Sequence, residues 1–168
     1  PISGKGMAKT QDLAVLDILR SGTGTGTVYS SPAGIVCGGD CSQAYQRGTL
    51  VDLMATPDAG SSFAGWSGNA DCNTGIRYIQ LTMDADKRCT AQFNLTHTLQ
   101  VTQTGTGSGT VTGEGDYRRG AFVTLFATPD SNSIFTGWTG TEDCKDGQVT
   151  INEDTSCSAI FTTFHWVG

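Results

Sequence analysis

The sequence predicts a mainly β protein built from two tandem antiparallel β-sheet modules, each stapled by a disulfide. The first observation is a repeat, because the block from Tyr45 to Gly68 recurs from Tyr117 to Gly140, 72 residues later. The second is composition, since 23 glycines and only 15% charged residues suit strands and turns rather than helices. The third is that four of the six cysteines occupy matching positions in the two copies. Self-similarity at a fixed period indicates that one small structural unit has been duplicated.

The repeat also sets the expected domain boundaries. The glycine-rich run Gly22–Val28 matches Gly105–Val111, and the closing Phe93 matches Phe161. We therefore expect an N-terminal extension at 1–12, a first module at 13–94, a second module at 95–163 and an apolar C-terminal tail at 164–168. Domains this small bury only about 60% of their unfolded surface, so a covalent staple matters to each.

The duplication selects among the many pairings that six cysteines permit. An 11-residue insertion in the first module places two cysteines close together, and the other four recur in the two copies. The simplest connectivity joins Cys37 with Cys41, Cys72 with Cys89, and Cys144 with Cys157. Zinc ligation and free thiols are the alternatives, but a lone Cys-x3-Cys pair is a poor zinc site because structural zinc needs four ligands. Paired cysteines indicate an oxidising compartment, and hence export.

Alternating apolar and polar residues predict the individual strands. The pattern is clearest at 50–55 and 122–127, with later strands at 76–83 and 149–151 and closing strands at 90–93 and 158–161. The glycine run that begins at Gly22 predicts a hairpin turn feeding a second strand. Residues 7–20 have helix-forming composition. Because they correspond to the alternating run at 99–103, we predict a strand at 14–19 and keep a helix as the alternative.

Charge and composition exclude several classes of function. The net charge is −6, with only 10 Lys and Arg residues and no basic cluster, which argues against binding nucleic acid or anionic membranes. No apolar run is long enough for membrane insertion and no signal peptide is present, which fits a processed chain or an excised fragment. We expect no cofactor, because the glycine run lacks dinucleotide-binding spacing. We expect no metal, because no repeated Asp spacing suits calcium.

Catalysis is not predicted, because no base, nucleophile and metal are placed together by the sequence. The chain has two histidines, His97 and His165, and neither is repeated in the other module. Paired carboxylates such as Glu142 and Asp143 fall on predicted turns, where solvation is the simpler interpretation. We therefore predict that the protein is not an enzyme.

Two aromatic pairs stand in matching Phe-x-Gly-Trp-x-Gly settings, Phe63 with Trp66 and Phe135 with Trp138. One interpretation makes each tryptophan a large core anchor, with glycines that allow close backbone approach. The other makes the tryptophans exposed platforms for a glycan. We favour the core, and solvent exposure of the two indoles separates the alternatives.

Several motifs together resemble a known family. They are Gly-x-Gly-x-Gly-x-Val from Gly22, the segment Pro32–Cys37, Tyr-x-x-Gly-Thr-x-Val from Tyr45, Phe-x-Gly-Trp-x-Gly from Phe63, and a closing Ala-x-Phe. The combination resembles the divergent internalin-type B-repeat family, whose modules occur in tandem in exported bacterial surface proteins. The resemblance covers about nine tenths of the chain and implies a small β-grasp-like module without known catalysis. The second module departs from the pattern by lacking the Pro32–Cys37 segment.

Apolar residues near both ends predict self-association. Ile2, Phe164, Trp166 and Val167 are the candidate assembly residues, because a β-prone apolar tail can add to the sheet of another copy. Repeated head-to-tail contacts of this kind build a filament when the rotation does not close. The alternatives are that the tail packs along its own module, or that another repeat begins there.

The leading functional hypothesis is a non-enzymatic extracellular structural protein of the bacterial cell surface. It would act as a stalk or spacer between neighbouring repeats, or as the subunit of a homopolymeric filament. The alternative is an adhesin module that binds a cell-surface glycan or protein through exposed aromatics or through the Cys37–Cys41 loop.

Overall fold

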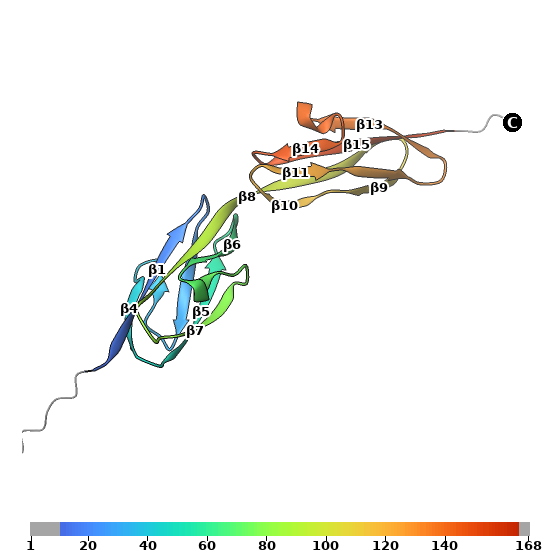
Figure 1. Ribbon diagram of the computed structural model, residues 1–168. Coiled ribbons are helices and arrows are strands. Elements are labelled where there is room, and N and C mark those ends of the chain that lie inside the picture. The colour runs from blue at the N-terminus through green and yellow to red at the C-terminus, as the bar shows by residue number, and fades with distance from the viewer. Residues whose placement is uncertain (1–10, 165–168) are drawn as a thin grey trace, which may run out of the picture. The chain divides into compact units, whose positions relative to one another are not determined.

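The computed structural model describes residues 11–164 of the 168-residue chain. The chain divides into two compact units between Asn94 and Leu95, and we call them the first and the second module. Both consist of strands (Figure 1), and the helices of the described residues are two short 3-10 turns, η1 (Ala70–Cys72) and η2 (Glu142–Cys144). The predicted mainly β fold with two tandem modules is confirmed.

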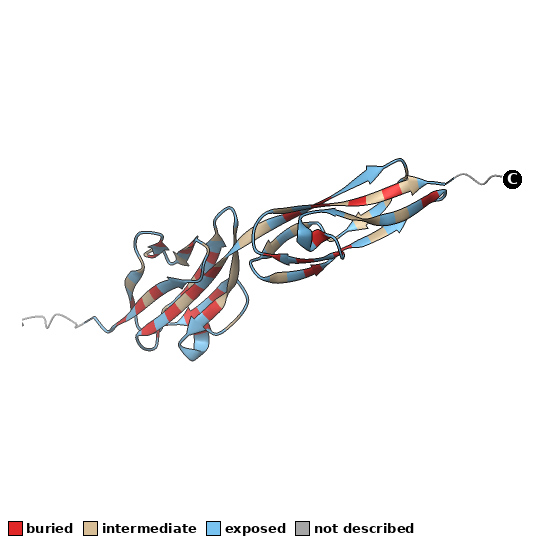
Figure 2. Cartoon of the chain, turned by 90° about the horizontal axis from the view of Figure 1, so that it is seen from above, coloured by how far each residue is buried: buried red, intermediate tan, exposed pale blue. Residues whose placement is uncertain are grey.

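The first module contains two four-stranded sheets. One has the order β4 (Ser42–Gln46), β1 (Leu13–Ser21), β8 (Lys87–Gly105) and β6 (Ser61–Gly68). The other has the order β3 (Val36–Cys37), β2 (Gly26–Ser31), β5 (Leu50–Pro57) and β7 (Tyr78–Thr82). Burial alternates along the strands (Figure 2), and inward-facing residues of both sheets form one hydrophobic core. Strand β8 contributes its first residues to this module and its later residues to the second.

The second module repeats this plan with shorter strands. One sheet has the order β10 (Gly115–Arg118), β8, β15 (Thr155–Thr163) and β13 (Ser133–Gly140). The counterpart of the other sheet consists of two pairs, β9 (Gly109–Thr112) with β12 (Phe126–Pro129) and β11 (Ala121–Thr124) with β14 (Gln148–Ile151). The strand that matches β5 is interrupted at Leu125, whose N–H donates to the Gly147 carbonyl at 2.7 Å.

The first and last strands of each module lie side by side in parallel, which corrects the expectation of wholly antiparallel sheets. Strand β1 pairs with β8 in parallel, with Ile18 opposite Cys89, and β8 pairs with β15 in parallel, with Val101 opposite Cys157. Parallel neighbours need a long connection. In each module that connection contains all the strands between the first and the last, including those of the second sheet.

The helix alternative for the N-terminal segment is wrong, because 13–21 forms β1. Ala14, Leu16 and Ile18 are buried, whereas Val15 and Leu19 are exposed. This period of two is that of a strand with one face on the core.

The glycine-rich run does not form the predicted hairpin. Strands β1 and β2 belong to different sheets, so the run from Gly22 is an arch that crosses from one sheet to the other. The glycines are needed because the chain passes over the ring of Phe93, where a Cβ on Gly26 would lie 2.6 Å from Cδ1. In the second module a Cβ on Gly109 would lie 2.5 Å from the ring of Phe161.

Candidate functional site

The three disulfides join the pairs of cysteines that the duplication indicates. Cys72–Cys89 fastens η1 to β8, Cys144–Cys157 fastens η2 to β15, and Cys37–Cys41 closes the loop that carries β3. The described residues contain no free cysteine. Each module therefore has its own covalent link between a 3-10 turn and its closing strand.

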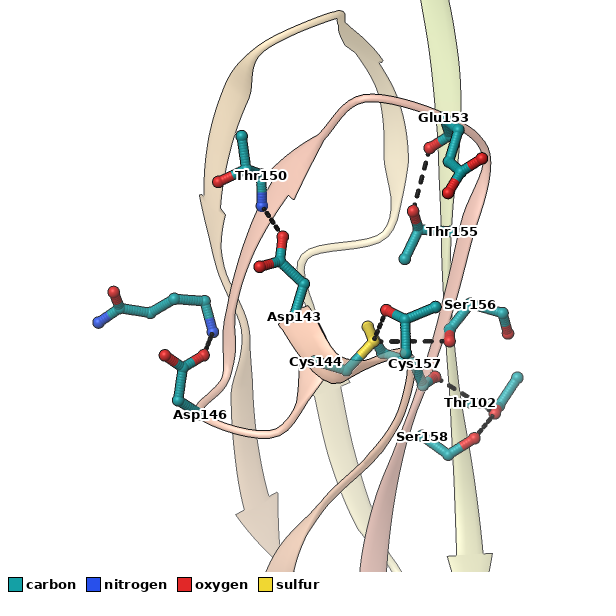
Figure 3. Close-up of a disulfide and its surroundings, with 12 residues drawn as sticks. Thr102, Asp143, Cys144, Asp146, Thr150, Glu153, Thr155, Ser156, Cys157 and Ser158 are labelled. Atoms are coloured by element: carbon teal, nitrogen blue, oxygen red, sulfur yellow. Dashed lines mark hydrogen bonds between the residues drawn. A yellow bond between two sulfur atoms is a disulfide. The ribbon is translucent and has the colours of Figure 1, made fainter.

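The second module's disulfide lies within a small hydrogen-bonded cluster (Figure 3). Cys144 Sγ is 3.2 Å from the Thr141 hydroxyl and 3.6 Å from the Ser156 carbonyl. The neighbouring Asp143 carboxylate accepts a hydrogen bond from the Thr150 N–H at 2.8 Å. The turn η2 is thus held by its disulfide and by the Asp143 carboxylate, which accepts a hydrogen bond from β14.

In the first module an ion pair adds to the disulfide Cys72–Cys89 in holding the turn η1. Lys87 Nζ lies 2.5 Å from Asp71 Oδ2 and 2.9 Å from Asp84 Oδ1. The lysine side chain is only 7% exposed, whereas both carboxylates are largely exposed. Hydrogen bonds to Asp71 and then Asp84 raise the pKa of Lys87, and the hydrogen bond from Lys87 lowers the pKa of Asp84. We call these three residues the Lys87 clamp.

The predicted core anchors lie in edge-to-face aromatic clusters. In the first module the Phe63 ring contacts Trp66 at 5.7 Å and Phe93 at 5.9 Å between centroids. Trp66 is only 5% exposed, and its Nε1–H donates to the Arg77 carbonyl at 3.4 Å. A glycan cannot stack on an indole buried in this way, which favours the core interpretation for Trp66.

The second module repeats this cluster in a more open form. Phe135 contacts Trp138 at 5.3 Å and Phe161 at 5.9 Å between ring centroids. Phe161 is buried, whereas Trp138 is half-buried and packs against the core of its module. The matching sequence motifs therefore give the same aromatic packing in both modules, but Trp138 is more exposed to solvent than Trp66.

One of the two histidines, His97, lies within the described residues. His97 Nδ1 lies 3.5 Å from Oδ1 of the exposed Asp154, and His165 lies outside the described residues. Within 11–164, no group of three or more His, Cys, Asp or Glu residues is placed to hold a metal ion.

The candidate assembly residues fall mostly outside the described part of the chain. Ile2, Trp166 and Val167 are not described. Phe164 is 38% exposed, and its N–H donates to the Asn132 carbonyl at 3.1 Å. The chain is therefore still attached to its own module at this residue, while the side chain faces solvent.

A row of exposed apolar side chains crosses the outer face of the first module's second sheet. Its members are direct cross-strand neighbours, since Tyr29 of β2 pairs with Val36 of β3 and with Met54 of β5, and Met54 pairs with Tyr78 of β7. Their exposed fractions are 52% for Val36, 47% for Tyr29, 43% for Met54 and 47% for Tyr78. We call these four residues the apolar row.

A polar row runs beside the apolar row. It consists of Ser31, Asp52 and Gln80, which are cross-strand neighbours on β2, β5 and β7. Gln80 Nε2 donates to Asp52 Oδ1 at 2.8 Å. Residues of both rows line a shallow hollow of about 180 Å³.

The two rows are not among the sites predicted from the sequence. A signal was available, because alternation in β5 puts Asp52 and Met54 on the face opposite the buried Val51 and Leu53. The register that aligns them with β2, β3 and β7 exists only in the fold.

No helix of the described residues could cross a membrane, since none combines the required length with the required apolar character.

Comparison with known proteins identifies a family for both modules. The family model described as the divergent InlB B-repeat domain matches residues 22–97 and again residues 99–164. No curated protein matches the sequence. Among solved structures, the major pilin protein T-13 from Streptococcus pyogenes serotype GAS131465 is similar over 91% of this chain and 97% of its own, with 9% identity and a TM-score of 0.33. A likeness this weak carries no argument about function.

Proposed function

Because the chain belongs to the divergent InlB B-repeat domain family, we propose that it is a non-enzymatic structural protein of the bacterial cell surface. It acts outside the cell as a stalk or spacer, or as the subunit of a filament assembled through exchange of a terminal strand. One observation carries the proposal: two modules of the same plan follow each other, each with its own hydrophobic core and its own disulfide.

The disulfides support an extracellular location. Protein disulfides persist outside the cell and are reduced in the cytosol. The links Cys72–Cys89 and Cys144–Cys157 span 17 and 13 residues, and closing a loop of that size stabilises a module by about 3 kcal/mol. Domains of this size gain proportionally more from such a link than large domains do.

The filament form of the proposal requires an open sheet edge that can accept a strand. In the first module β3 covers the outer edge of β2, with Val28 opposite Cys37. The second module lacks the insertion that carries β3, and within residues 11–164 its β9 pairs only with β12. The outer edge of β9 is therefore the best acceptor, because it corresponds to an edge that already takes a short antiparallel strand in the first module.

The test is assembly of the full chain at high concentration, observed by negative-stain electron microscopy and light scattering. Wild-type protein is expected to form linear polymers. Replacing Trp166 and Val167 with Ser is expected to leave it monomeric, because an exchanged strand loses its apolar anchors. Phe122→Ser is the matched control, since Phe122 is 64% exposed on β11 and takes no part in the exchange.

Two outcomes would decide against exchange of a terminal strand. One is a wild-type protein that stays monomeric at all concentrations, which leaves only the spacer role. The other is a tail variant that polymerises as well as the wild type.

A further inference from the structure

We propose that the outer face of the sheet β3–β2–β5–β7 binds a neutral glycan chain along the apolar row and the polar row. This inference does not rest on filament assembly. It concerns a face of the first module, whereas assembly is assigned to the edge of β9 in the second.

The spacing of the two tyrosines suits a chain of sugar rings. Tyr29 and Tyr78 lie on β2 and β7, with Met54 of β5 between them. Neighbouring strands are about 4.8 Å apart, so the two tyrosines lie about 10 Å apart across the sheet. Each offers a flat aromatic surface to the apolar C–H face of a pyranose, and the distance between them is close to the length of two linked rings.

The polar row supplies the complementary hydrogen bonds. A pyranose in contact with the apolar row presents its hydroxyl rim sideways, towards Asp52 and Gln80. The Asp52 carboxylate has acceptor sites beyond the one that Gln80 uses, and Ser31 is both a donor and an acceptor. The hydrogen bond with Asp52 raises the pKa of Tyr78 above its ordinary value, which links this end of the apolar row to the polar row. Apolar surface beside a few oriented polar groups is the usual composition of a small-molecule site.

Charge selects a neutral glycan over an anionic polymer. Asp52 is the one charged residue among the seven residues of the two rows, so no cation there balances a sulfate, phosphate or carboxylate group. The protein as a whole carries a net charge of −6, which adds long-range repulsion. A protein partner that covered this face would have to desolvate Asp52, whereas sugar hydroxyls replace its lost water directly.

The insertion limits the site to the first module. Val36 extends the apolar row and lies on β3, directly before the loop closed by Cys37–Cys41, and its N–H donates to the Asp40 carbonyl in that loop at 3.0 Å. A loop fixed before binding loses little conformational entropy on binding. By the register of the two repeats, the second module has Thr112, Phe126 and Asp146 in place of Tyr29, Met54 and Tyr78, and nothing in place of Val36. Among these three counterparts only Phe126 is aromatic, so these positions hold no pair of rings across the strands like Tyr29 and Tyr78.

The experiment is affinity electrophoresis of the full chain in gels that contain one polysaccharide each. The neutral polymers are hydroxyethylcellulose, glycol chitin, xylan and dextran, and the anionic ones are hyaluronan and heparin. At least one neutral polymer is expected to retard the wild type. Tyr29→Ala and Tyr78→Ala are each expected to weaken binding about tenfold, because each removes an aromatic contact worth about 1.4 kcal/mol.

Two further variants separate stacking from general effects on the fold. Tyr29→Phe keeps the ring and is expected to keep binding, and Phe126→Ala is the matched control in the second module. Melting temperatures of all variants are expected to stay near the wild-type value, because the side chains that are replaced are exposed to solvent. Three results would overturn the proposal: no retardation by any neutral polymer, retardation that persists in both Tyr→Ala variants, or self-association of the wild type that the same two variants abolish.

Discussion

The Lys87 clamp shows how single residues solve the same local problem differently in the two modules. Each module must hold a 3-10 turn against its neighbouring strands. The first uses a lysine between two carboxylates, with Lys87 bound to Asp71. The second has Thr155 at the position of Lys87, and its Asp143 binds the backbone N–H of Thr150 instead. In both modules the aspartate that precedes the first cysteine of the disulfide, Asp71 or Asp143, accepts a hydrogen bond. The donor is Lys87 in the first module and the Thr150 N–H in the second.

The pH dependence of the clamp follows from the two pKa shifts. The pKa of Asp84 is lowered from 3.8, so its stabilising effect is present above that pH and is lost as the pH falls through the folded-state pKa. The pKa of Lys87 is raised from 10.5, so its effect is complete below that pH and is lost as the pH rises through the folded-state value. The clamp thus stabilises the first module fully between these two limits.

We predict that Lys87→Met lowers the melting temperature of the first module by about 2 to 6 °C at pH 7. Methionine keeps the buried stem of the side chain but removes the charge. The difference from wild type is expected to shrink below pH 3.8, where Asp84 becomes protonated in the unfolded chain. Calorimetry from pH 2.5 to 8 measures it, and a difference that is constant over this range would contradict the clamp. Lys145→Met is a matched control, because that lysine is 59% exposed in its ion pair with Glu142.

At the scale of elements, the insertion with β3 is the main difference between the modules. It covers the edge of β2 and adds Val36 to the apolar row. Besides the pairing of β3 with β2, two interactions hold it: the Cys37–Cys41 disulfide encloses one part, and Ser30 holds the other, where its Oγ accepts the Ile35 N–H at 2.9 Å. The loop is therefore a fixed part of the sheet.

We predict that replacing Cys37 and Cys41 with Ser loosens only the part of the loop that the disulfide encloses. The amides of Val36, which directly precedes that part, and of Asp40, which lies in it, each bond to the other residue's carbonyl and are expected to exchange faster with deuterium. The Ile35 amide is expected to stay protected, because Ser30 holds it independently. Residue-resolved hydrogen exchange measures both. Equal acceleration at Ile35 would show that the disulfide alone holds the loop, and a change at Thr112 of the second module would indicate a global effect.

At the scale of the whole molecule, the two cores are separate. The core of the first module runs from Ala14 to Phe93 in the sequence, and that of the second from Leu99 to Cys157. Each core includes one long-loop disulfide of its own. A change inside one core should therefore act mainly on the module that contains it.

We predict that replacing Cys144 and Cys157 with Ala destabilises the second module by about 3 kcal/mol and leaves the first nearly unchanged. The matched variant replaces Cys72 and Cys89 with Ala and is expected to show the reverse. Amide NMR spectra recorded during thermal unfolding report each module separately. Simultaneous loss of both sets of signals in either variant would show that the modules unfold as one.

The sequence alone determined the mainly β class, the duplication and the cysteine pairs, because these depend on local alternation and on comparison of the two copies. It also indicated the buried residues of β5, since Val51, Leu53 and Ala55 share one face of a strand. The family follows from the same motifs, and the matched ranges 22–97 and 99–164 confirm it.

Only the tertiary structure decided which strands are neighbours. The glycine run at Gly22 looks like a hairpin in sequence, yet β1 and β2 lie in different sheets, because β1 pairs with the distant β8. The same holds for the candidate site, where Val36, Tyr29, Met54 and Tyr78 come from four strands and are aligned by cross-strand register. Side-chain periodicity within a strand is a local property of the chain. Register between strands depends on contacts between residues far apart in sequence, and those contacts form only when the chain has folded.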